Sequence, residues 1–251
     1  MNVYWKETKY EFLKMLRNPR FALSALGMPL LFYILYAVVM YKSRHMGGAT
    51  MASYMLATFG SFGVMGACLF GIGLNLANER GLGWLEVKRA SPLPPAVYFL
   101  AKLTIGLLFG AAEMLVLFAL GIGLAHVRLG PMDTLRMLGI LIAGSIPFGA
   151  LGLALGYLVK PDSAPVVVNL IYLPLSFFSG LWMPVEFLPN ALQHAAVYLP
   201  PYHLSRLALG VLGADRDQAY WGHWQALVCF TAIFLGLAMI GYRRDNARQN
   251  G

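Results

Sequence analysis

The longest strongly charged segment of this otherwise apolar chain is residues 78–95, which lies between two long hydrophobic runs. Its middle, residues 84–90, can form about two helical turns, because Gly81 and Gly83 loosen the start and a proline cluster from Pro92 stops the helix. A short charged helix held between two apolar segments is suited to contact with a soluble partner. The alternative is a solvated loop that only joins the two segments.

A second residue whose side chain could have a chemical role is Glu113, which lies near the middle of the apolar run 96–125. An ionisable side chain at that depth in a membrane is costly and is commonly functional. The alternative is a protonated or hydrogen-bonded carboxyl group that fixes helix packing. Asn169 and Ser176 are sparse polar residues in the run 165–183. These three side chains are the candidate residues of a substrate path.

Several kinds of catalytic and cofactor chemistry have no motif in the sequence. It contains no Gly-Lys-Ser or Gly-Lys-Thr of a P-loop, no Gly-x-Ser-x-Gly and no His-Glu-x-x-His. The five histidines lie at or outside the ends of the apolar runs, which opposes a haem held by intramembrane histidine pairs. Cys68 and Cys229 lie inside apolar runs and show no metal-ligand spacing. We therefore expect a protein that is not an enzyme and binds no cofactor or metal.

The composition indicates an all-α integral membrane protein. Of its 251 residues, 59% are hydrophobic and only 12% are charged, whereas a soluble domain has roughly twice that charged fraction. About 20 apolar residues are enough to cross a bilayer as a helix. The chain therefore has room for six spans within a single transmembrane domain, residues 1–251, and they are expected at 21–41, 51–77, 96–125, 135–159, 165–183 and 221–242.

The glycines and prolines of these runs predict how the helices pack. The run 51–77 is rich in glycine, and Gly152 and Gly156 form a small-xxx-small pair, so neighbouring helices can approach closely at these positions. Pro147 is expected to kink the fourth span.

Two further segments are not expected to span the membrane. Residues 1–20 form an amphipathic helix with Trp5, Phe12 and Leu16 on one face, and we expect it to lie in the membrane interface as an elbow before the first span. Residues 184–220 are apolar, but prolines divide them into pieces too short to cross. We expect them to form a re-entrant helical hairpin between the fifth and sixth spans.

The distribution of basic residues predicts the orientation of the chain. Its formal net charge is +8, and about twice as many Lys and Arg residues fall on the side of the two termini and residues 78–95 as on the opposite side. The positive-inside rule then places both termini and residues 78–95 in the cytoplasm, and residues 184–220 outside.

Three motifs resemble the type-2 permease family of ATP-binding-cassette (ABC) exporters. Residues 17–20 (Arg-Asn-Pro-Arg) look like the end of the family's elbow helix. Residues 79–92, with an acidic residue and a glycine before a Leu-bearing helix and a proline, look like its cytoplasmic coupling loop. Residues 179–184 (Ser-Gly-Leu-Trp-Met-Pro), followed by Leu188-Pro189 and Pro200-Pro201, are similar to its signature after the fifth span. The commoner family loop has Thr-Leu-Glu where this chain has Gly-Trp-Leu-Glu at residues 83–86.

The resemblance implies a permease that works in the inner (cytoplasmic) membrane as a homodimer or close heterodimer in the lipid bilayer. It also implies a cytoplasmic ABC ATPase in two copies, which binds the ATP and Mg that this chain does not bind; no nucleic-acid partner is expected. The residues implied to couple the permease to the ATPase are Glu79, Arg80, Gly81, Trp84, Leu85, Lys88 and Arg89.

The function implied is ATP-driven export of an amphiphilic substrate, such as a drug, antibiotic or lipid. The sequence leaves open a polysaccharide-exporting permease of the same family, a stand-alone channel or secondary transporter, and a sensing partner of a histidine kinase. A channel or secondary transporter requires a polar path or inverted repeats. Neither is visible in the sequence, which favours the ABC permease.

Overall fold

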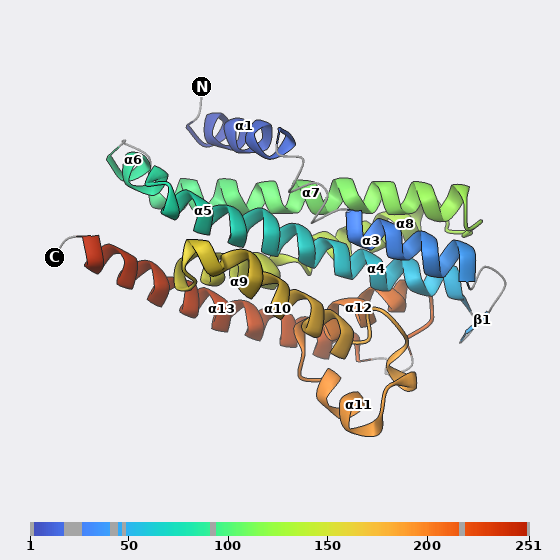
Figure 1. The fold of residues 1–251 in the computed structure, drawn as a ribbon. Helices are drawn as coiled ribbons and strands as arrows, with labels where there is room; N and C mark the ends of the chain where they lie inside the picture. The colour runs from blue at the N-terminus through green and yellow to red at the C-terminus, as the bar shows by residue number, and fades with distance from the viewer. Residues whose placement is uncertain are drawn as a thin grey trace.

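The computed structural model describes residues 3–17, 27–40, 45–46, 49–90, 94–215 and 219–249. Most of the motif expected at the end of the elbow helix (residues 18–20), the start of the first expected span and the stop at Pro92 lie outside these residues. Within them the chain folds into a bundle of helices that lie roughly along one common direction (Figure 1).

Four helical segments are long and apolar enough to cross a membrane: Met51–Gly81, Ala96–Gly123, Pro131–Leu158 and Tyr220–Ala247. They coincide with four of the six expected spans. In the other two expected spans, the described helices are shorter. The first contains α3 (Met28–Tyr33) and the π-helical segment Ile34–Met40, and the fifth contains α10 (Ala164–Phe178).

The central helix of the bundle consists of α4 (Met51–Cys68), a π-helical segment Leu69–Leu74 and α5 (Asn75–Gly81), which run on without a break. Every residue of α4 is buried, because α4 packs against α3 and four further helices: α7 (Pro95–Gly123), α8 (Pro131–Ala143), α9 (Ile146–Leu158) and α12 (Pro200–Val211). Glycine permits a close approach between the π-helical segment and α9. A Cβ atom at Gly73 would lie 3.0 Å from the carbonyl oxygen of Gly152, so the two backbones are nearly in contact.

The remaining long helices surround this central helix. They are α7 (Pro95–Gly123), the pair α8 (Pro131–Ala143) and α9 (Ile146–Leu158), and α13 (Tyr220–Gln249). The break between α8 and α9 falls at Gly144 and Ser145, and Ile146 and Pro147 are the first two residues of α9. Proline is tolerated in the first turn of a helix but not in its interior, so a new helix begins there. Aromatic contacts hold α10 against the central helix, with the rings of Phe62 and Tyr172 stacked and their centroids 4.5 Å apart.

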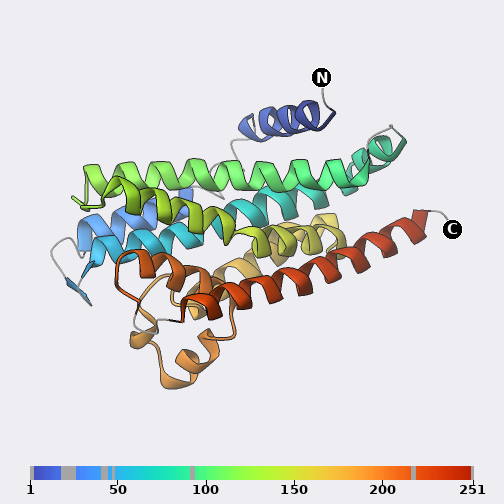
Figure 2. The same cartoon turned by 180° about the vertical axis from the view of Figure 1, so that it is seen from behind.

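One end of the bundle carries the short elements. There, β1 (His45–Met46) pairs with β2 (Ala49–Thr50), and the segment after α10 forms a 3-10 turn (Val185–Phe187), α11 (Asn190–Ala196) and α12 (Pro200–Val211). α12 packs against α4, α8 and α13, while α11 projects from the side of the bundle (Figures 1 and 2).

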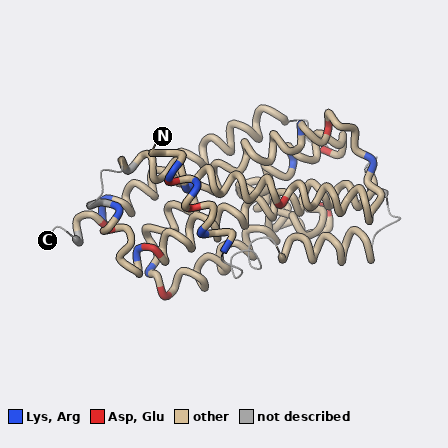
Figure 3. The backbone as a smooth tube through the Cα atoms, turned by 90° about the horizontal axis from the view of Figure 1, so that it is seen from above, with Lys and Arg blue, Asp and Glu red and all other residues tan. Residues whose placement is uncertain are grey.

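The other end carries both termini, α1 (Val3–Leu16) and α6 (Trp84–Ala90). Figure 3 shows that charged residues gather toward the two ends of the bundle and are sparse between them. This distribution is the one that a membrane-embedded helical bundle requires, because charge is costly in hydrocarbon.

Candidate functional site

The amphipathic helix α1 packs on the bundle through its charged face. Thr8, Glu11 and Met15 are buried at intervals of three and four residues, which is the spacing of one helix face. Trp5 and Leu16 point away from the bundle and are 64% and 57% exposed. Lys6, Lys9 and Arg17 are exposed as well, so the free surface of α1 carries both apolar and basic side chains, a combination that suits the membrane interface.

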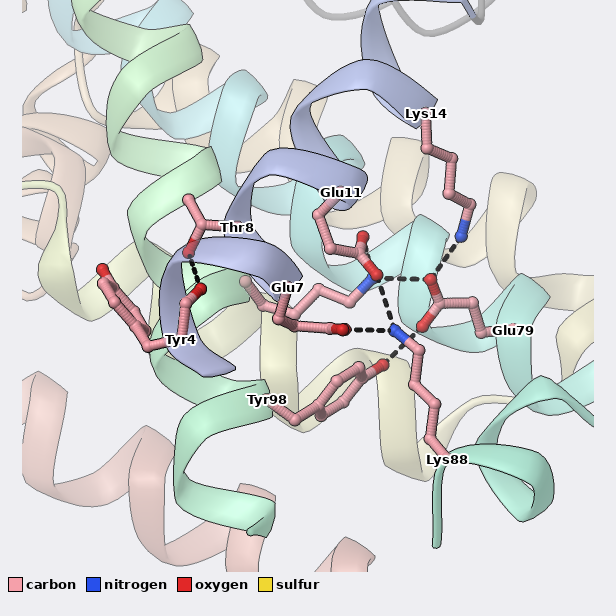
Figure 4. A network of polar contacts seen from close by, with 9 residues as sticks. Tyr4, Glu7, Thr8, Glu11, Lys14, Glu79, Lys88 and Tyr98 are labelled. Atoms are coloured by element: carbon pink, nitrogen blue, oxygen red, sulfur yellow. Dashed lines mark hydrogen bonds and ion pairs between the residues drawn. The ribbon is translucent and has the colours of Figure 1, made fainter. Parts of the chain in front are cut away.

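The charged face of α1 joins an ion-pair cluster, which we define as Glu7, Glu11, Lys14, Glu79, Lys88, Tyr98 and Lys102 (Figure 4). These residues come from α1, α5, α6 and α7. The cluster balances three carboxylates against three ammonium groups.

Glu79 and Lys102 form the centre of the cluster, and each is 1% exposed. The Lys102 ammonium group lies 2.7 Å from a carboxylate oxygen of Glu79 and 2.7 Å from one of Glu11. Glu79 also accepts hydrogen bonds from Lys14 and from the hydroxyl group of Tyr98. Buried charges are tolerated only when they are paired in this way.

Lys88 attaches the short helix α6 to this centre. Its ammonium group lies 2.6 Å from Glu7 and 2.7 Å from Glu11, and 4.5 Å from the ring centroid of Tyr98. Burial alone would lower the pKa of Lys88, but the charges of Glu79 and Glu11 outweigh it and raise the pKa above its usual value. Lys88 therefore stays charged, and α6 is fixed to α1.

Arg80 makes a second junction, on the opposite side of α5. Its guanidinium donates two hydrogen bonds to Asp245 of α13, at 3.0 and 2.7 Å. It also donates to the carbonyl oxygens of Gly156 and Val159 at 2.8 and 3.1 Å, at the end of α9. The planar fork of arginine suits this multiple contact. Arg80 thus ties α5 to the ends of α9 and α13.

The outer surface of α6 carries two large apolar side chains beside the exposed Glu86. Trp84 is 55% exposed and Val87 61%, and Leu82 in the preceding turn is 74% exposed. Leu85, in contrast, is 5% exposed and belongs to the hydrophobic core. The helix starts after Gly83, whose φ of +72° is a conformation that favours glycine.

A cleft of about 660 Å³ is lined by residues of α1, α5 and α6. Its lining includes Leu82, Trp84 and Tyr10 together with residues of the ion-pair cluster. Apolar side chains thus stand beside paired charges at the surface.

The residues of the expected coupling site therefore divide into two groups. Trp84 is at the surface, while Glu79, Arg80 and Lys88 are paired within the chain and Leu85 is buried. A side chain at Gly81 would meet Pro161 at 2.7 Å, so this glycine permits a close contact. The backbone of Arg89 belongs to α6, and its side chain lies outside the described part of the structure.

The three expected substrate-path residues make separate contacts. Glu113 is 1% exposed and faces α4 at Gly63, where an added Cβ atom would lie 1.9 Å from its carboxyl group. Its two carboxyl oxygens make no hydrogen bond to any described residue. Asn169 is exposed and donates to the carbonyl oxygen of Pro165 at 2.9 Å. Ser176 is buried and accepts a hydrogen bond from Trp182 at 2.9 Å.

Five members of the ion-pair cluster are not among the site residues expected from the sequence: Glu7, Glu11, Lys14, Tyr98 and Lys102. A signal for the first three was present, because their spacing places them on one face of the expected helix. A signal for Lys102 was also present, since it is a lysine inside an apolar run and requires a buried partner.

The long apolar helices, with charged residues concentrated toward the ends of the bundle, define the class: this is a multi-pass membrane protein. Comparison with known proteins gives the family. A family model described as ABC-2 type transporter matches residues 3–212, and the chain belongs to this family.

Two curated relatives indicate a transport function for the family. The chain is 29% identical over 247 residues to YvfS of Bacillus subtilis (strain 168), which carries a transport-permease name; the match covers 98% of this chain and 100% of that protein. It is 28% identical over 187 residues to the inner membrane transport permease YhhJ of Escherichia coli (strain K12). That match covers 68% of this chain and 46% of YhhJ, so it spans just under half of the longer protein.

Proposed function

We propose that this chain is the permease subunit of an ATP-driven ABC exporter and that α6 receives the force of ATP hydrolysis from a separate ATPase chain. The observation that carries the proposal is the construction of α6. Its outer surface presents Trp84 and Val87, while its inner side is fixed by Lys88 and Leu85 to the rest of the bundle. A partner that binds the outer surface of α6 can therefore move the helices that α6 contacts as well as α6 itself.

The ion-pair cluster supplies the route for that movement. Lys88 pairs with Glu7 and Glu11 of α1, and Lys102 joins Glu11 to Glu79. A displacement of α6 would carry α1 and the adjoining ends of α5 and α7 with it, because breaking a buried pair costs about 3–5 kcal/mol. A two-state bundle can be shifted by a small difference in contact at such a site.

The contacts of α6 suggest the chemistry of the partner surface. Trp84, Val87 and Leu82 would enter an apolar depression on the ATPase, as buried aromatic anchors do in many interfaces. Lys88 and Arg80 are engaged within the chain, so in this proposal they position α6 instead of pairing with acidic residues of the partner.

The complete assembly in this proposal follows the family arrangement. Six spans, with the elbow at α1 and the hairpin of α11 and α12, place both termini and α6 in the cytoplasm. Two permease copies, either identical or closely related, stand above two ATPase copies that bind ATP and Mg. An amphiphilic substrate, such as a drug, antibiotic or lipid, suits the apolar character of the bundle.

The experiment that tests the proposal replaces Trp84 by alanine and by aspartate and measures ATPase co-purification and substrate-stimulated ATP hydrolysis. Loss of a central aromatic anchor commonly costs about 2 kcal/mol or more, which corresponds to about a thirtyfold loss of affinity. Trp221→Ala is a matched control, because Trp221 is 75% exposed at the other end of the bundle. Unchanged co-purification for both Trp84 variants would exclude α6 as the docking element.

A further inference from the structure

A cavity of about 720 Å³ lies at the end of the bundle away from the termini, between α8, α12 and α13. Figure 2 shows the start of α8, the start of α13 and α12 together at that end. Its volume is in the range of about 300–1,000 Å³ that is typical of ligand sites. It is separate from the ion-pair cluster and from the cleft beside α6, which lie at the opposite end.

Glycine residues create part of the space in this cavity. Gly139 of α8, Gly210 of α12 and Gly213 after α12 line it, and an added Cβ atom at any of the three would meet no atom within 4 Å. Bare backbone at these positions widens the cavity without exposing buried core.

Among the residues that the structure describes, the charged groups that line the cavity are one cation, Arg136, and one anion, Asp215. Arg136 is on α8, and its side chain is 66% exposed. A guanidinium nitrogen of Arg136 lies 3.7 Å from a carboxylate oxygen of Asp133. Asp215 follows α12, with its side chain 9% exposed and its carboxylate 3.7 Å from Arg206 and 3.8 Å from His223. A lining with one charge of each sign suits a zwitterionic ligand better than an anionic one.

The uncharged lining residues match the membrane interface. Tyr220 and Trp224 come from the first turns of α13, where amphipathic aromatic rings commonly lie at the level of lipid headgroups. Ile140 and Val211 provide an apolar wall beside them. Pro131 and Tyr220 begin two of the apolar segments that are long enough to cross a membrane, so the cavity lies where such segments meet the headgroup region.

We propose that this cavity is a binding site for one zwitterionic phospholipid of the phosphatidylethanolamine type. Arg136 binds the phosphate, and Asp215 accepts a hydrogen bond from the headgroup ammonium. Tyr220 and Trp224 contact the glycerol region, and the first part of an acyl chain runs along Ile140 and Val211. The site depends on membrane embedding alone and is independent of the proposed ATPase coupling at α6.

Native mass spectrometry tests the proposal on the full chain released from nanodiscs that contain equal amounts of phosphatidylethanolamine and phosphatidylglycerol. Wild type is expected to retain one phosphatidylethanolamine. Arg136→Gln removes a charge-assisted phosphate contact and should weaken retention about tenfold. Arg128→Gln is the matched control, because Arg128 is an exposed arginine in the loop before α8 that does not line the cavity.

Gly210→Leu and Gly139→Leu provide a second test that leaves the charges in place. Each side chain would extend into open space, and leucine is a better helix former than glycine, so the fold is expected to survive. Both variants should lose the lipid about as fully as Arg136→Gln. Equal lipid retention by all variants, no bound lipid on the wild type, or preferential retention of phosphatidylglycerol would each overturn the proposal.

Discussion

Replacing Lys102 by methionine removes the ammonium group at the centre of the ion-pair cluster while keeping an unbranched side chain of similar length. Lys102 is 1% exposed and bridges Glu11 and Glu79, which are 3% and 1% exposed. The variant leaves two buried carboxylates with fewer partners, although Glu11 keeps Lys88 and Glu79 keeps Lys14 and Tyr98. Because these partners remain, we expect a loss near the lower end of the range of about 3–5 kcal/mol for a broken buried pair.

The two cysteines provide the assay for this prediction. Cys68 is buried and Cys229 is exposed. In a Cys229→Ser background, a thiol-reactive fluorescent dye reports unfolding through Cys68 alone. A loss of about 3 kcal/mol corresponds to a fall in the unfolding temperature on the order of 10 °C for a chain of this length.

Lys9→Met is the matched control, because Lys9 is an exposed lysine of α1. A double-mutant cycle with Glu11→Gln measures the pairwise part of the effect. An unfolding temperature of Lys102→Met equal to that of Lys9→Met, or a coupling energy near zero in the cycle, would refute the view that Lys102 holds the junction together.

Three further changes test other contacts. Gly63→Ala should lower stability by about 1–3 kcal/mol in the same thiol assay, because its Cβ atom would overlap the carboxyl group of Glu113; Glu113→Ala should relieve the loss, and no relief would contradict this packing. Arg80→Lys should increase proteolysis of the C-terminal part of α13, since lysine cannot make all four hydrogen bonds, and an unchanged digestion pattern would oppose this. The Nδ1 atoms of His203 and His223 are hydrogen-bonded at 2.9 Å. Burial, together with the charge of His223, lowers the pKa of His203 to about 4. The unfolded chain then binds the proton more tightly, so stability should fall as the pH decreases from about 6.5 toward 4, and His203→Asn should show a flatter profile; parallel profiles would argue against the contact.

The sequence was sufficient to predict the elements whose cause is local. Four of the expected spans coincide with long apolar helices, the Gly83 turn occurs where glycine permits it, and the fourth span, in which a kink at Pro147 was expected, is interrupted just before that residue. The short helix from Trp84 was also predicted, because the residues that start it are adjacent in the chain.

The features that could not be predicted depend on pairings between distant parts of the chain. Glu11 and Lys102 are 91 positions apart, and the sequence alone offers many other residues of opposite charge with which either could pair. A helix of seven residues also has too few turns for its pattern to show that Leu85 faces inward and Trp84 outward. Tertiary packing determines which side of α6 faces inward. It therefore decides that Trp84 is at the surface of the proposed coupling site and that Leu85 anchors the helix.

The equal numbers of positive and negative side chains in the ion-pair cluster have a consequence for membrane voltage. A single charge that crosses the full potential gains or loses about 2.3 kcal/mol per 100 mV. The three carboxylates and three ammonium groups that join α1, α5, α6 and α7 sum to zero. When these elements shift together, the cluster carries no net charge through the electric field, and the resting potential of the cell neither drives nor opposes its displacement.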